Sequence, residues 1–149
     1  MKNTLVVVAD LACFKAFRLE NNHPHPTRHL RLVEEFNIAD AHEKLVDRVT
    51  DLAGRFPRSS GGAGARGAMS DGERHNFELE SRKRLVRQLA QRLNALARGP
   101  EIECCLLAAS LEINHQLLAE LEPSVRAKIE KNVSADLTKM EQAEILRHF

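Results

Sequence analysis

The sequence predicts one α/β domain, with a mixed sheet of about five strands and helices on its faces. Residues 5–9 are continuously apolar and rich in valine, as in a strand that is buried on both sides. Two further strand patterns at residues 12–19 and 30–37 give a leading meander. After residue 73, helical and strand patterns alternate, which favours crossovers between parallel strands. The length of 149 residues fits a single domain over residues 1–149.

Short polar connections separate the first three strands. The turn at residues 10–11 is short enough for an antiparallel hairpin. A polar, proline-containing loop is expected at residues 21–28, before the third strand. In that strand we expect Leu30, Leu32 and Glu34 on the same side, because alternate residues share a face. Residues 39–46 fit a short helix.

The longest helical pattern begins after a glycine-rich segment. Ser70 and Glu73 have the spacing of a capping box, and the Gly99-Pro100 pair should end the helix near Arg98. Apolar residues at three- and four-residue steps predict a stripe that packs on the sheet. This stripe consists of Leu79, Val86, Leu89, Leu93 and Leu96.

The C-terminal third is expected to alternate strands with helices. A strand is predicted within residues 101–109, and Ser110 is a candidate cap for the helix that follows. A second short strand is predicted at residues 129–133, after one helical turn. Thr138 and Glu141 have the spacing of another capping box, which opens a final helix.

Composition and charge argue against binding of nucleic acid by overall charge and against a membrane protein. The net charge of +1 gives no overall field that would attract nucleic acid, so any attraction must come from local clusters. We see no apolar run long enough to span a bilayer and no signal peptide, and we expect a cytoplasmic protein without a membrane partner.

The three cysteines fit a reducing compartment. Cys104 and Cys105 are adjacent in a strand and point to opposite faces, so buried structural thiols are favoured over a redox or metal role.

Residues 54–72 contain every glycine of the chain except Gly99, together with Arg55, Arg58 and Arg66. Glycine allows the backbone to bend freely, and the arginine fork suits phosphate. We expect a flexible loop that is a solvated connection, a contact for RNA phosphates or a contact for a protein partner. The loop formally matches a dinucleotide fingerprint but lacks the preceding strand, and it lacks the Lys-Ser or Lys-Thr of a P-loop.

The long helix carries a basic cluster formed by Arg82, Lys83, Arg84 and Arg87. These side chains form either a solvated face paired with nearby glutamates or a surface that faces RNA. The glutamates in question are Glu73, Glu78 and Glu80. The chain has no Trp or Tyr, which removes the best stacking platforms and argues against a single-strand binding module.

The histidines do not predict a metal site. His23, His25 and His29 could turn toward one ion in an extended segment, but no acid or cysteine nearby in the sequence completes the set. Exposed loop histidines are therefore favoured. His75 lies in the first helical turn and is a candidate general base, but no nucleophile is identifiable beside it. We assign no metal, no cofactor and no catalytic residue.

Three segments of the chain resemble the bacterial host-attachment protein family. They are the VVVAD of residues 6–10, the Gly61-Gly62 pair with Arg66-Gly67-Ala68-Met69, and the ADLT of residues 135–138. The order and spacing of these segments extend the resemblance over essentially the whole chain. The helix at residues 73–96 lies where that family has its long helix.

That family in turn is similar to the central domain of archaeal and eukaryal peptide-chain release factors. Those factors carry a Gly-Gly-Gln loop before a long basic helix, and the loop promotes hydrolysis of peptidyl-tRNA. Here Gly61 and Gly62 are followed by Ala63, which has no polar side chain to replace the glutamine. The resemblance implies an α/β fold of the ribonuclease H-like, translation-component type, and by analogy a connection to RNA or the ribosome.

The leading hypothesis is a non-catalytic protein that contacts RNA or the ribosome, without DNA specificity. The candidate RNA- and phosphate-binding residues are Arg55, Arg58, Gly61, Gly62, Arg66, Arg82, Lys83, Arg84 and Arg87. Two alternatives stay open: a regulatory or interaction protein that influences surface attachment, and a hydrolase acting on peptidyl-tRNA or a related ester. The sequence does not determine the oligomeric state.

Overall fold

The computed structural model describes residues 2–22, 24, 27–37 and 71–149. The strands are β1 (Thr4–Ala9), β2 (Cys13–Asn22), β3 (Thr27–Asn37), β4 (Cys104–Ala109) and β5 (Ile129–Ser134). The helices are α2 (Asp71–Ala97), α3 (Leu111–Glu120), α4 (Pro123–Lys128) and α5 (Gln142–His148). The helix expected at residues 39–46 lies outside the described residues. The glycine-rich loop expected at residues 54–72 also lies outside them, except for residues 71 and 72, which begin α2.

The five strands form one mixed sheet in the order β3-β2-β1-β4-β5. β2 is antiparallel to both β1 and β3, whereas β1, β4 and β5 run parallel to one another. The predicted α/β class, the leading meander and the later crossovers are therefore confirmed. The narrower ribonuclease H-like assignment stays a prediction.

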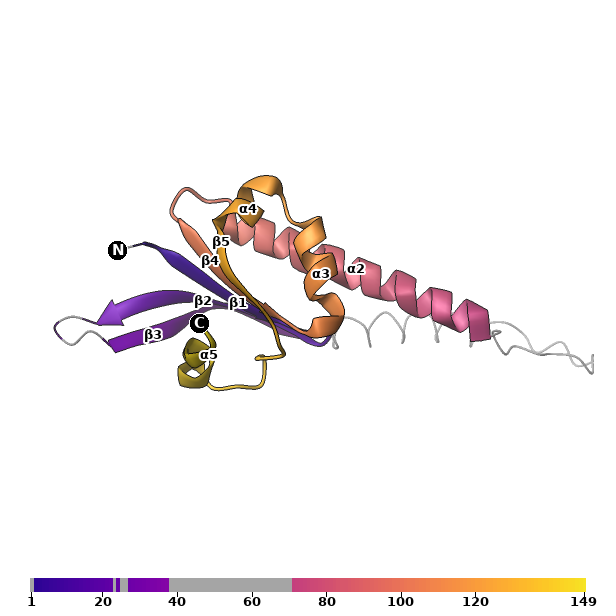
Figure 1. Cartoon of the computed structure of the whole chain (residues 1–149), viewed down its shortest axis with the longest axis horizontal. Coiled ribbons are helices and arrows are strands. Elements are labelled where there is room, and N and C mark those ends of the chain that lie inside the picture. Colours follow the sequence, from indigo (N-terminus) through magenta and orange to yellow (C-terminus); the bar gives the residue numbers. More distant parts are fainter. Residues whose placement is uncertain (1, 23, 25–26, 38–70) are drawn as a thin grey trace, which may run out of the picture.

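Helices cover the two faces of the sheet unequally. α2, α3 and α4 lie on one face, and α5 lies on the other (Figure 1). The central position of β1 explains why the apolar run at residues 5–9 is continuous. Leu5 and Val7 pack in the core on the α2 face, and Val6 and Val8 pack in the core on the α5 face. A central strand with helices on both faces needs apolar side chains at every position.

The β2–β3 hairpin is longer than expected. Asn21 and Asn22 pair with Arg28 and Thr27, so the predicted loop at residues 21–28 is wrong at both ends. The polar composition of these positions misled the prediction, because this part of the hairpin lies near its tip, where polar side chains can be solvated within a strand.

A β-bulge in β3 corrects the expected alternation of that strand. Phe17 is opposite Leu32 and Ala16 is opposite Glu34, which leaves Val33 as an extra residue. The extra residue reverses the phase, so Glu34 lies on the α2 face rather than with Leu32 on the α5 face. The expectation for Glu34 is wrong because strict alternation assumes a regular strand.

After the bulge, β3 makes two contacts on the α2 face of the sheet. Glu34 on the α2 face forms a bidentate ion pair with Arg92. Phe36, on the same face, stacks on Phe14 with ring centroids 5.0 Å apart.

α2 packs on the sheet only along its C-terminal half. Val86, Leu89 and Leu93 are fully buried, as the apolar stripe predicted, but Leu79 is 36% exposed. Residues 72–80 are all exposed, and Figure 1 shows this end of α2 projecting past the sheet. Leu79 belongs to neither core cluster of the described residues, so its place in the predicted core stripe is wrong.

Two predicted helix caps take other roles. Ser110 occupies the N-cap position of α3 but makes no side-chain cap bond, although its carbonyl accepts the amides of Ile113 and Asn114. α5 begins at Gln142 with Glu141 in the N-cap position, so Thr138 does not cap it. The expected strand near residue 129 and the helical turn before it are confirmed as β5 and α4.

Candidate functional site

The projecting half of α2 separates acidic from basic side chains along the helix. Residues 71–80 carry four acidic residues and one arginine, whereas residues 81–92 carry five basic residues and no acidic one. The change of sign falls where the helix leaves the sheet, between the exposed residues 72–80 and the buried Val86. The chain as a whole is nearly neutral, so this basic stretch is a local feature.

Some of these cations are paired with carboxylates. Lys83 Nζ lies 3.4 Å from Glu80 Oε1, and both side chains are more than half exposed. Arg92 is held by Glu34 of β3, and the hydrogen bond and charge of that carboxylate raise the pKa of the Arg92 guanidinium. Within the part of the chain that the structure describes, Arg84 and Arg87 form no ion pair. The glutamates of α2 therefore pair with Lys83, but they do not pair with these two arginines.

The predicted basic cluster does not lie on a single face of α2. Successive residues of an α-helix are about 100° apart, so Arg84 and Arg87 fall on the same side, away from the buried Leu89. Both are exposed. Arg82 falls on the side that faces the sheet and is half-buried, and Lys83 lies between the two sides. We call the side that carries Arg84, Arg87 and Gln91 the outer face of α2.

The remaining sequence-predicted site residues lie outside the described part of the chain. They are Arg55, Arg58, Gly61, Gly62 and Arg66. Their contribution to a site with α2 stays a prediction. In the sequence, the segment that carries them directly precedes the projecting end of α2.

A polar cluster that the sequence did not predict lies where the parallel strands end. Asp10 follows β1, and its Oδ1 accepts the amides of Ala12 at 2.7 Å and Cys13 at 2.6 Å. Its Oδ2 lies 2.9 Å from the Thr138 hydroxyl, which also lies 2.6 Å from Asp136 Oδ1. A hydroxyl has one hydrogen, so it donates to one of the two carboxylates at a time.

The same cluster influences the titration of Asp136. Burial alone would raise the pKa of the Asp136 carboxyl, but hydrogen bonds donated by the hydroxyl and the amide of Thr138 hold the pKa below its ordinary value. The sequence did contain a signal for this cluster. Asp10 and residues 136–138 lie in two of the segments that resemble the host-attachment family. What the sequence did not show is that these segments, 128 residues apart, meet through one hydroxyl.

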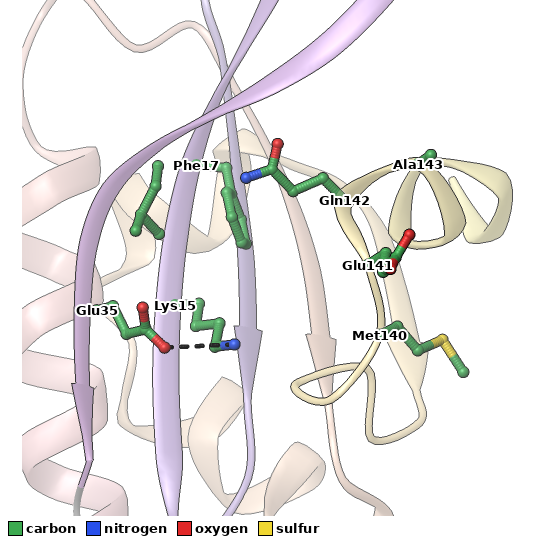
Figure 2. Close-up of a pocket in the computed structure, with 8 residues that line it drawn as sticks. Lys15, Phe17, Glu35, Met140, Glu141, Gln142 and Ala143 are labelled. Atoms are coloured by element: carbon green, nitrogen blue, oxygen red, sulfur yellow. Dashed lines mark ion pairs between the residues drawn. The ribbon is translucent and has the colours of Figure 1, made fainter.

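A groove lies between the α5 face of the hairpin and the start of α5 (Figure 2). Its volume is about 410 Å³, with Phe17 and Leu32 on the sheet side and Met140 opposite. Figure 2 shows Gln142 pointing toward Phe17, and the Lys15–Glu35 ion pair, 3.3 Å long, on the sheet side of the groove. The walls of the groove carry one basic side chain, Lys15, and two acidic ones, Glu35 and Glu141.

The described histidines and cysteines do not form a metal site. His29 lies in β3, not in a loop, with Nε2 3.4 Å from Glu20 Oε2. Cys104 and Cys105 are buried free thiols, and Cys13 is half-buried. Within residues 2–22, 24, 27–37 and 71–149, no three metal-ligating side chains are grouped together.

The fold and the site define a mixed α/β protein with a long, charge-segregated helix that projects from the sheet. Residues 5–149 match the family model described as "Protein required for attachment to host cells". This match spans nearly the whole sequence, so the chain belongs to that family, as the motif resemblance predicted. A comparison with curated proteins found no match. The similarity to release factors stays a prediction, and in the described part of the chain no helix has both the length and the apolar character of a membrane span.

Proposed function

We propose that this protein binds RNA or the ribosome through the outer face of α2, without hydrolase activity. The observation that carries the proposal is the pair of exposed arginines, Arg84 and Arg87, which have no carboxylate partner in the described residues. They lie one helical turn apart on the outer face of α2, where both are exposed. An unpaired guanidinium on such a surface can bind a phosphate with two parallel hydrogen bonds.

The chemistry favours the backbone of the nucleic acid over its bases. Phosphate contacts by arginine release counterions and give affinity without sequence readout. The chain has no Trp or Tyr for base stacking, so we expect neither strong sequence preference nor DNA specificity. Arg55, Arg58 and Arg66 belong to the proposal as further phosphate contacts, because their loop leads directly into α2.

Co-sedimentation with purified ribosomes tests the proposal. The variant Arg84→Ala/Arg87→Ala should reduce the bound fraction, and addition of Arg58→Ala and Arg66→Ala should reduce it further. The matched control is Lys131→Ala/Arg147→Ala, which removes the same charge from exposed positions on β5 and α5. Equal loss of binding in both double variants would show a general charge effect and contradict a site on α2.

A contact with the ribosome has consequences for the location of the protein and for the attachment phenotype. A ribosome-associated protein shares the compartment of the ribosome, so we propose a cytoplasmic location, which cell fractionation tests. Any influence on attachment to host cells would then be indirect, through translation. A peptide-release assay with the wild-type protein and Ala63→Gln tests the hydrolase alternative, and we expect no release by the wild type.

A further inference from the structure

The outer face of α2 has the spacing of a helix-pairing stripe. Phe77, Glu80, Arg84, Arg87 and Gln91 follow one another at steps of three and four residues, and all are exposed. Such alternation of three and four is the spacing that keeps one side of a helix against a neighbouring helix. Phe77, at 57% exposure, provides an apolar contact in an otherwise polar stripe.

The order of charges in this stripe determines which partner would fit. A second α2 in parallel would bring Glu80 against Glu80 and Arg84 against Arg84. An antiparallel α2 centred between residues 80 and 84 brings Glu80 of each copy opposite Arg84 of the other. The same alignment places Phe77 opposite Arg87 of the second copy, where a cation–π contact can form. Acidic and basic halves thus complement each other in one orientation only.

We infer that a second copy of this chain docks antiparallel on the outer face of α2. The stripe from Phe77 to Gln91 is about 21 Å long, so the contact is below the size of a permanent interface and the dimer is weak. Its polar character makes it sensitive to salt. The dimer would also regulate RNA binding, a consequence that rests on the proposed function. The acidic half of one copy covers Arg84 and Arg87 of the other and takes the place of RNA phosphates.

A charge swap tests the dimer without RNA, by sedimentation equilibrium at about 50 mM salt, where the Debye length is more than 10 Å. The wild type should associate reversibly. Glu80→Arg and Arg84→Glu should each weaken association by about tenfold, because two symmetric pairs change from attractive to repulsive. The double variant Glu80→Arg/Arg84→Glu should restore it. Lys139→Glu, a charge reversal at an exposed site away from α2, is the control and should leave association unchanged.

Two results would overturn the inference: a wild type that stays monomeric at millimolar concentration, or a double variant as weak as the single ones. Circular dichroism of each variant checks that the helix is intact. RNA affinity, measured separately, distinguishes the two proposals, because Glu80→Arg should weaken the dimer while retaining RNA binding, whereas Arg84→Glu should weaken both. Unchanged RNA affinity in Arg84→Glu with an intact charge-swap pattern would contradict the proposed function alone.

Discussion

Thr138 is a single residue that joins the two ends of the chain. It is 3% exposed, and its hydroxyl lies between Asp10, which closes the β1–β2 turn, and Asp136, which follows β5. A buried hydroxyl with these partners is costly to replace, because the carboxylates would lose a donor. The segment between β5 and α5 is therefore tied to the edge where the parallel strands end.

Thr138→Val should destabilise the fold by about 1 kcal/mol at pH 7, since the side chain keeps its shape and loses its hydrogen bonds. The folded-state pKa of Asp136 is lowered, so its stabilising effect is present above its unfolded pKa, near 3.8, and is lost as the pH falls through the folded value. The difference between wild type and variant should therefore shrink toward pH 3. Urea unfolding across pH measures it, with Thr27→Val at an exposed site as control. A difference that persists unchanged at pH 3 would contradict this role.

The cysteines should differ in reactivity according to burial. Burial chiefly raises the pKa of the Cys105 thiol to about 11, and it also raises the pKa of Cys104. Burial raises the pKa of the Cys13 thiol as well, but Cys13 is only half-buried whereas the other two are buried. An alkylating reagent at pH 8 should therefore reach and label Cys13 first, and the other two only after unfolding. Mass spectrometry of the native protein checks the order, and rapid labelling of Cys105 would be inconsistent with it.

At the scale of elements, α2 is one helix with two environments. Its C-terminal half packs Val86, Leu89 and Leu93 on the sheet, and its N-terminal half has no such support among the described residues. A helix of this length keeps its exposed half by continuing from a half that tertiary packing stabilises. The stability of the fold should therefore depend on one half of α2 and be insensitive to the other.

Leu89→Ala and Leu79→Ala form a matched pair on this helix. Leu89 is fully buried, so its truncation should cost about 2–5 kcal/mol through lost burial and the cavity left behind. Leu79 is 36% exposed, and its truncation should cost no more than about 0.5 kcal/mol. Denaturant unfolding measures both. Equal costs would show that Leu79 is also part of a packed core.

The elements also show what sequence patterns can predict. β1 was predictable because a run without polar residues fits only a strand covered on both faces, and α2 was predictable because its apolar stripe has helical spacing. The bulge at Val33 was not, since an extra residue in one strand is defined by its pairing with the other. The hydroxyl of Thr138 illustrates the same limit for the site. Its spacing to Glu141 suits a cap, and only the strand order β1-β4-β5, which is set by the sheet, brings it to Asp10.

At the scale of the whole molecule, charge is arranged locally in a chain that is neutral on average. The net charge of +1 conceals a helix with acidic residues toward its projecting end and five basic residues in the twelve positions that follow. Such an arrangement gives no long-range attraction, and it concentrates positive potential at one surface. Binding of a polyanion should therefore be local to α2 and its preceding loop, and it should depend on salt.

The salt dependence of RNA binding is the sharpest test of a binding surface on α2. Fluorescence anisotropy with a labelled single-stranded RNA, at several salt concentrations, gives the slope of log affinity against log salt for the wild type, Arg84→Ala/Arg87→Ala and the control Lys131→Ala/Arg147→Ala. Each phosphate contact on a single strand contributes about −0.7 to this slope, so loss of two contacts should reduce its magnitude by about 1.4 in the α2 variant and leave the control unchanged. Wild-type binding that is absent or independent of salt, or equal slopes for all three proteins, would contradict the claim that the outer face of α2 binds RNA.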